Sequence, residues 1–271
     1  LFRSPRCSPE VRDVIITLNR FAEEQKFYST YANVKLDEDG RFRSEWKQYG
    51  TTQAPGRLSS AQTLWGSGGN SQNLPKRAYD MYVADEDCVF IYFDLAQAEA
   101  RYVGWDANIE QWKQDFELAR TTGDFDAHRS LAATMFKIPY DDVPREDENE
   151  TGEHTIRWIA KRCRHGLNYR MHIGRLAQTT GMSHGQAASN YYTYHRTNPE
   201  LQIWWKKLES VVKKTRMLHN SLGRRLLFLE RLEGDALDAI VAFRPQSTIG
   251  DKVSRVWAQC HADDRWDKSK A

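Results

Sequence analysis

The stretch that decides the fold is Arg157-Trp-Ile-Ala-Lys161-Arg-Cys-Arg-His165-Gly-Leu-Asn-Tyr169. Its four numbered residues follow at intervals of four, so on a helix they share one face that drifts by about 40° per step. Together they cover about 18 Å of helix axis, close to the length of an extended nucleoside triphosphate. We call these four residues the ladder.

The order of chemical types along the ladder favours a nucleotide. Its two cations come first, near the helix N-terminus, where the helix dipole also attracts anions. Its two rings follow, where a sugar and a base could stack. The alternative is an ordinary solvated helix, because Arg and Lys four residues apart are common on such helices.

Charge is unevenly distributed on both sides of the ladder, although the net charge of the 271 residues is only +2. Residues 141–153 hold seven acids and one Arg, whereas residues 157–175 hold six Arg or Lys and no acid. Residues 206–225 add seven bases with one acid. The basic stretches predict a positive surface suited to phosphates, or else two solvated helix faces. We interpret the acidic run as a solvated loop or helix start.

Composition places the chain among globular proteins. Apolar residues make up 40% and charged residues 28%, which excludes disorder and low-complexity classes, and the length suggests one to two domains. Four separated cysteines form no CxxC pair and indicate free thiols in a reducing compartment. No signal peptide and no membrane-length apolar window is recognisable, and the missing initiator Met suggests a fragment or processed product.

Hydrophobic periodicity predicts a mostly helical chain. The apolar run 88–93 predicts a buried strand, and Asp94 follows it, either as a residue with chemistry at a rigid strand end or as a helix N-cap. Asp39-Gly40 indicates a turn, and Leu222-Gly223 a hairpin within 218–230. The expected fold class is α+β, a small sheet with a large helical subdomain. Helices are expected over 9–28, 97–105, 108–120, 126–136, 155–169, 172–180, 184–197, 199–218 and 233–259.

The ladder stretch resembles the fingers-helix motif R-x3-K-x3-F-G-x2-Y of family A (polymerase I-like) DNA polymerases. Other motifs of that family occur in the same order, over about residues 18–257. They are Gly56-Arg57-Leu-Ser-Ser60 with Gln72-Asn73-Leu-Pro-x-Arg77 at the thumb–palm junction, Asp94-Leu-Ala-Gln-Ala-Glu99-Ala-Arg101 as motif A, and Asp126-Ala-His128-Arg129.

The resemblance implies a right-hand polymerase core with a small antiparallel palm sheet, incomplete here, and a large helical fingers subdomain. The implied divisions are 1–60 for the end of the thumb and its junction, 61–125 for the palm with motif A, 126–217 for the fingers, and 218–271 for an incomplete return to the palm. The implied activity is template-directed DNA synthesis, which adds deoxynucleotides to a primer 3′-hydroxyl by two-metal phosphoryl transfer.

The resemblance also implies roles for single residues. Asp94 and the Leu95 carbonyl would bind Mg²⁺, while Arg157, Lys161 and His128 would clamp the triphosphate. Lys161 would also protonate the departing pyrophosphate. The remaining implied contacts are the sugar 2′ position for Glu99, the sugar for His165, the templating base for Tyr169, and DNA for Arg57, Asn73, Arg77, Arg224 and Gln246.

Three departures from the family pattern stand out. His165 replaces the usual Phe or Tyr, either as a ring-for-ring exchange or as a change in sugar discrimination and pH dependence. Arg170 replaces Gly and would add a cation near the template. The second catalytic carboxylate motif, V-H-D-E, is absent before Ala271, and His261-Ala-Asp-Asp264 is a poor substitute. We therefore expect the parent protein to polymerise DNA and this fragment alone to be weak or inactive.

The expected partners are primer-template DNA and deoxynucleoside triphosphates, with no membrane and a processivity factor left open. The expected location is the cytoplasm of a bacterium or of a phage-infected host. Two alternatives remain: a non-catalytic nucleic-acid-binding protein derived from a polymerase, and a different nucleotide-binding enzyme. The absence of G-x4-G-K-[ST] disfavours the second.

Overall fold

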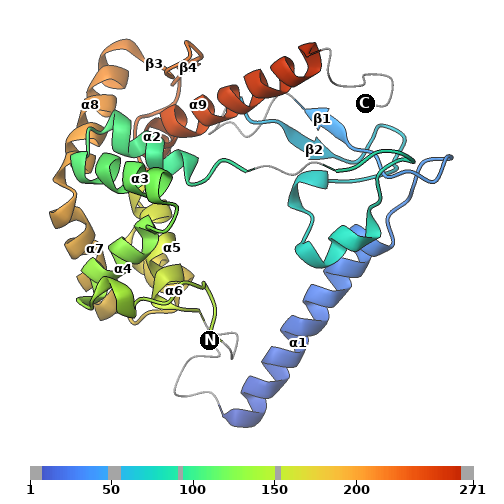
Figure 1. Ribbon diagram of the computed structural model, residues 1–271, viewed down its shortest axis with the longest axis horizontal. Helices are drawn as coiled ribbons and strands as arrows, with labels where there is room; N and C mark the ends of the chain where they lie inside the picture. The colour runs from blue at the N-terminus through green and yellow to red at the C-terminus, as the bar shows by residue number, and fades with distance from the viewer. Residues whose placement is uncertain (1–7, 48–55, 91–93, 150–153, 264–271) are drawn as a thin grey trace. The chain divides into compact units, whose positions relative to one another are not determined.

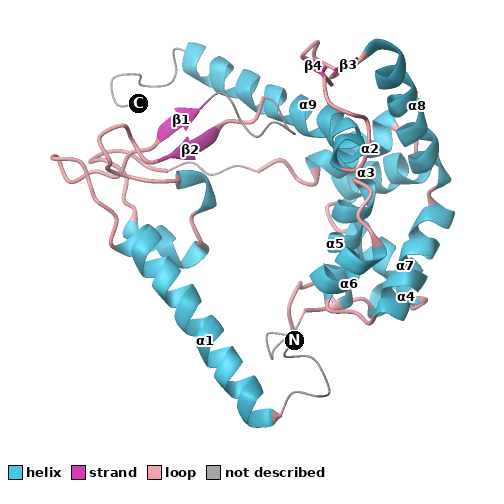
Figure 2. Cartoon of the chain, turned by 180° about the vertical axis from the view of Figure 1, so that it is seen from behind, coloured by secondary structure: helices cyan, strands magenta, loops and turns pink. Residues whose placement is uncertain are grey.

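The structure is a computed structural model that describes residues 8–47, 56–90, 94–149 and 154–263 (Figure 1). These residues fall into two compact units. The first comprises residues 8–47 and 57–90, and the second comprises Gly56 and residues 94–263. Secondary structure along both units is coloured in Figure 2.

The first unit contains helix α1, Pro9–Phe27, and a two-stranded antiparallel sheet of β1, Glu45–Lys47, and β2, Ser59–Ala61. Ser8 caps α1, because its hydroxyl accepts from the Val11 N–H at 3.4 Å. The predicted helix over 9–28 is thereby confirmed, but none of its described side chains is buried. A π-helical turn, Tyr28–Ala32, and two 3-10 helices, Ser71–Asn73 and Lys76–Met81, complete this unit.

The second unit is mostly helical. Its described helices are α2, Ala98–Asp106; α3, Glu110–Thr122; α4, Ala127–Phe136; α5, Ile156–Asn168; α6, Ile173–Thr180; α7, His184–Thr197; α8, Pro199–Thr215; and α9, Asp235–Ala262. Each of them matches a helix predicted from periodicity to within a few residues. Strands β3, Met217–His219, and β4, Arg225–Leu227, form the predicted hairpin. Helices with two small antiparallel sheets confirm the α+β class.

The predicted buried strand over 88–93 is wrong in its described part. Residues 88–90 form no strand, and residues 91–93 lie outside the described residues. Val89 is 80% exposed and Phe90 is 71% exposed. The physical reason is that no described strand pairs with this run, so β-prone side chains have neither a hydrogen-bonded ladder nor a covering face.

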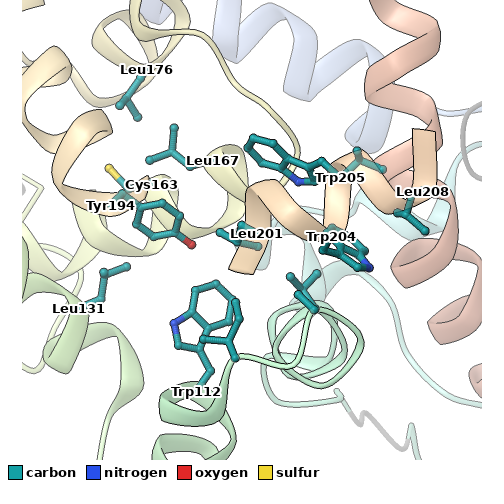
Figure 3. Packing of buried hydrophobic residues seen from close by; sticks show 14 of the residues in the cluster. Trp112, Leu131, Cys163, Leu167, Leu176, Tyr194, Leu201, Trp204, Trp205 and Leu208 are labelled. Carbon is teal, nitrogen blue, oxygen red and sulfur yellow. The ribbon is translucent and has the colours of Figure 1, made fainter. Parts of the chain in front are cut away.

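The core of the second unit surrounds the buried face of α5 (Figure 3). Leu167 of α5 is fully buried and belongs to one apolar cluster with Tyr194 of α7 and Trp205 of α8. The Tyr194 hydroxyl donates to Asn168 Oδ1 at 2.7 Å, and Trp205 Nε1 donates to the Asn168 carbonyl at 3.1 Å. The core therefore fixes the C-terminal end of α5 by both packing and buried hydrogen bonds.

The same core encloses a charged side chain, Arg164 of α5, which is only 3% exposed. Its guanidinium lies over the rings of Trp112 and Phe116, with 4.9 and 5.6 Å to the ring centroids. Its Nε and Nη1 atoms have no hydrogen-bond partner among the described residues. The ring faces, the contact with Tyr194 and the nearby Asp115 charge together compensate the burial of this cation.

The strands β1 and β2 were not anticipated, because three-residue polar strands carry no alternating apolar pattern. The turn predicted at Asp39-Gly40 is present, since the Gly40 N–H donates to the Asp37 carbonyl at 2.9 Å. Within the described ranges, no helix combines the length and apolarity that crossing a bilayer would require.

Candidate functional site

The N-terminal half of the ladder is held by carboxylates. Arg157 Nε donates to Asp126 Oδ2 at 2.7 Å, and Arg157 Nη1 also pairs with Asp147. Lys161 Nζ donates to the other oxygen of Asp147 at 2.9 Å. One carboxylate thus bridges both ladder cations, which places the two cations side by side on α5.

Asp147 overturns the interpretation of the acidic run as merely a solvated loop. Burial alone would raise the pKa of Asp147, but its bonds and charge contacts with Lys161 and Arg157 hold it below the usual value. Burial likewise opposes a lowered pKa of Asp126, and the Arg157 bond with two backbone donors outweighs it. Both carboxylates are therefore ionised at neutral pH. The usable signal was the acidic run immediately before a basic helix start.

Asp126 has two structural tasks. Its Oδ1 accepts from the backbone N–H groups of His128 and Arg129, at 2.7 and 3.3 Å, and so caps α4. Its Oδ2 holds Arg157, as above. A single side chain thus ties the start of α4 to the first turn of α5. This explains physically why the Asp126-Ala-His128-Arg129 motif begins with a carboxylate.

His128 contributes no charge to the site. It is 7% exposed, and its Nδ1 has no hydrogen-bond partner among the described residues. Burial, followed by the nearby Arg164 charge, lowers the pKa of His128 to about 3. The ring is therefore neutral at pH 7. The charges that act on it include those of Arg157 and Lys161, the two residues with which it is expected to clamp the triphosphate.

Arg129 has a structural role that the motif did not reveal. It is 5% exposed, its Nε donates to the Val143 carbonyl at 2.8 Å, and its Nη2 donates to the Tyr140 carbonyl at 3.0 Å. Its guanidinium also lies over the Tyr140 ring, 4.4 Å from the centroid. Arg129 therefore fixes the backbone of residues 140–143, at the start of the acidic run that carries Asp147.

The C-terminal half of the ladder is held by ring contacts and a carboxylate. His165 and Tyr169 meet edge to face, with 5.7 Å between ring centroids. The Tyr169 hydroxyl donates to Glu99 Oε2 of α2 at 2.6 Å. Two residues predicted for the nucleotide, from distant parts of the sequence, thus come together. Gly166 lies two residues before the end of α5, where an added Cβ would come within 2.7 Å of Met171 Sδ and 3.3 Å of Met171 Cβ.

Arg170 stands in the left-handed region, with φ of +66°, two residues past the end of α5. The Met171 N–H donates to the Gly166 carbonyl at 3.1 Å, which is the helix-ending arrangement that favours Gly at position 170. The side chain pairs with Glu209 and lies 3.5 Å from Asp238. The cation that was expected near the template is therefore paired with two carboxylates in the structure.

A pocket of about 330 Å³ begins at the end of the ladder. Tyr169 and Gln246 line it together with Asp235, Asp238 and Ala239. Gln246 is supplied by α9, directly after Pro245 inside that helix. Two predicted ligand contacts, one for the base and one for DNA, thus face the same space.

Motif A lies at the edge of a second pocket. Asp94 is exposed, and Leu95 lines a space of about 630 Å³ together with Tyr102, Trp105 and Lys252. The motif's Arg101 is structural, since its Nη1 donates to the Phe116 carbonyl at 3.1 Å. Among the described residues, no group of three or more His, Cys, Asp or Glu side chains is placed to hold a metal.

The predicted DNA contacts are distributed over both units. Arg57, Asn73 and Arg77 belong to the first unit, where Arg77 donates to Glu24 at 2.6 Å and lies over the Phe27 ring. Arg224 belongs to the second unit and forms a bidentate pair with Asp251, with Nη2 to Oδ1 at 2.6 Å.

Comparisons with known proteins agree with these motifs. The profile described as DNA polymerase family A matches residues 9–238. The chain is 26% identical over 222 residues to DNA polymerase I of Pseudomonas aeruginosa, covering 78% of this chain and 22% of that protein. It is 24% identical over 227 residues to DNA polymerase I of Helicobacter pylori, covering 79% of this chain and 22% of that protein.

A solved structure shows the same fold. The POL domain of Pol1 from M. smegmatis, in complex with DNA primer-template and dNTP, aligns with a TM-score of 0.63 and 23% identity. The alignment covers 86% of this chain and 40% of that domain chain. The chain thus spans less than a quarter of the length of the two curated relatives.

The chain belongs to DNA polymerase family A.

Proposed function

We propose that this chain forms the nucleotide-binding part of a template-directed DNA polymerase, which adds deoxynucleotides to a primer 3′-hydroxyl. The observation that supports this most is the pairing on α5: two adjacent cations at one end, and a ring locked to Glu99 at the other. Arg157 and Lys161 bind the triphosphate, and Lys161 protonates the departing pyrophosphate. His165 contacts the sugar, Glu99 its 2′ position, and Tyr169 the templating base.

Asp94 and the Leu95 carbonyl are proposed contacts for Mg²⁺. Oxygen donors suit this hard cation, but each ion needs several of them. The described residues offer one exposed carboxylate here and no cluster that could hold a metal. They do not by themselves fit a two-ion centre, so catalysis by this chain alone is proposed to be weak.

The proposed polymer partner is primer-template DNA. Arg57, Asn73 and Gln246 would contact DNA near the primer end. Arg77 and Arg224 would also contact DNA, and Arg224 is held by Asp251. The proposed divisions are thumb end and junction for 1–60, palm for 61–125, fingers for 126–217, and palm again for 218–271. The proposed setting is the cytoplasm of a bacterium or of a phage-infected host.

Primer extension with Mg²⁺, at chain concentrations high enough to detect the weak activity proposed above, tests the proposal. Asp94→Ala should abolish extension, and Lys161→Ala should reduce it by about 10²-fold or more, because both remove charge stabilisation at the reacting phosphates. Arg120→Ala is the control, since Arg120 is an exposed cation that pairs with Glu117 on α3. Extension unaffected by Asp94→Ala would exclude the role proposed for Asp94. DNA binding without any extension by the wild-type chain would instead favour the second candidate, a non-catalytic nucleic-acid-binding protein, a reading consistent with the lack of a metal-holding cluster among the described residues.

A further inference from the structure

Asp147 is carried to α5 by a short segment whose backbone is fixed on both sides. On the downstream side, the Thr155 N–H donates to the Asp147 carbonyl at 2.9 Å, and the Thr155 hydroxyl donates to the Glu146 carbonyl at 2.6 Å. Thr155 is also the N-cap of α5. The backbone of Asp147 is therefore tied to the start of the helix that carries the ladder.

On the upstream side, the same segment is tied to α4. Buried Arg129 holds the carbonyls of Tyr140 and Val143, four to seven residues before Asp147. The segment cannot drift far from the ladder while these bonds persist. The Asp147 carboxylate therefore has a high effective concentration at the two cations, as any tethered ligand does.

The Asp147 carboxylate does for the cations what phosphate oxygens would do. It presents one oxygen to Arg157 and the other to Lys161. The contact is accessible to an incoming anion, because the Lys161 side chain is 50% exposed and the Asp147 side chain is 32% exposed. An anion that reaches both cations meets a ligand already in place.

Asp126 and Asp147 contact Arg157 through different nitrogen atoms and have different further partners. Asp126 binds Arg157 through Nε, and it is also committed to capping α4. Asp147 binds Arg157 through Nη1 and shares itself with Lys161. Loss of Asp147 from the site would free donors on both cations while Asp126 still orients the guanidinium.

We propose that Asp147 is an internal competitor of the nucleotide's phosphates, which weakens nucleotide binding at Arg157 and Lys161 until a polyphosphate displaces it. The proposal rests on the proposed function, because it assumes that the ladder binds the triphosphate. It assigns Asp147 a role in setting nucleotide affinity.

The test is equilibrium binding to the whole 271-residue chain, measured by calorimetry with two probes, a deoxynucleoside triphosphate and inorganic triphosphate. Asp147→Asn should bind both probes roughly three- to thirtyfold more tightly than wild type, since two partly exposed ion pairs no longer compete. Asp147→Ala should act in the same direction, so the result does not depend on one variant. Asp142→Asn, which removes an exposed acid from the same run, should change affinity less than twofold.

Unchanged or weaker binding by both Asp147 variants would overturn the proposal and would make Asp147 a residue that positions the cations for the phosphates. Lys161→Ala separates this failure from failure of the proposed function. If Lys161→Ala lowers the affinity for the probes and neither Asp147 variant raises it, only the proposed role of Asp147 is refuted. Unchanged affinity and unchanged primer extension in Lys161→Ala would instead refute the proposed role of the ladder.

Discussion

The two ends of α5 are held in different ways. At the N-terminal end, Arg157 and Lys161 are paired with carboxylates at partly exposed positions. At the C-terminal end, Leu167 and Asn168 are buried, and Asn168 is bonded to two other helices. Ionic contacts near water are easily exchanged, whereas buried packing is not. The difference indicates that the cations can change partners while the ring end stays in place.

The largest expected effect comes from removing buried packing at the C-terminal end of α5. Leu167→Ala should lower the free energy of unfolding by about 2–5 kcal/mol, because it removes a fully buried side chain and leaves a cavity. Urea denaturation measures this. Ile156→Ala, at a half-buried position in the first turn of α5, is the matched control and should lower the free energy of unfolding clearly less. Equal losses at both positions would contradict the contrast between the two ends.

A second prediction uses pH to test the burial of His128, which lies near the N-terminal half of the ladder. Folding lowers the pKa of His128 to about 3, chiefly by burial and then by Arg164, so the unfolded chain takes up the proton first as pH falls below about 6.5. The contribution of His128 to the free energy of unfolding is therefore fully present at pH 7.5. At pH 5 the free energy of unfolding is lower by about 2 kcal/mol because of this group.

His128→Gln should remove that part of the pH dependence, measured as unfolding free energy at the two pH values. Burial also lowers the pKa of His195, but this contribution is present in both proteins and cancels in the comparison. The carboxylates Asp126 and Asp147, with lowered pKa values, lose their contribution only below about pH 4. An identical pH slope in wild type and variant would show that His128 is not buried in neutral form.

The smallest expected effect concerns the backbone that ends α5. Arg170→Gly and Arg170→Ala both remove the pairs with Glu209 and Asp238, so their difference isolates the left-handed conformation at φ of +66°. The Gly variant should be more stable than the Ala variant by about 1 kcal/mol. Thermal unfolding of the two variants, compared at one temperature, checks this. Equal stability would mean that residue 170 leaves the left-handed region when its ion pairs are lost.

Much of the helical unit could be predicted from sequence, because long amphipathic helices carry a strong local signal. The spacing of the ladder also correctly placed Arg157 and Lys161 near the start of α5 and Tyr169 at its end. The partners of the ladder could not be read in this way. Asp126 lies 31 residues before Arg157, and only the packing of α4 on α5 brings them together.

Two further features could not be predicted from sequence for the same reason. The run 88–93 has strand composition, but a strand also needs a partner, which no described residue provides for 88–90. The neutral state of His128 also could not be predicted from its residue type, because it depends on burial and on the Arg164 charge. Local sequence predicts an element or a residue type, and long-range packing decides its pairing and charge.

The buried guanidinium of Arg164 has a consequence for sequence divergence. Because Trp112 and Phe116 present ring faces to it, replacing either with an aliphatic residue would remove part of the compensation for this buried cation. Replacing Arg164 alone would leave a void between those rings. These three positions should therefore change together among related chains, so an aligned set of homologues should show Arg at 164 only where aromatic residues are retained at 112 and 116.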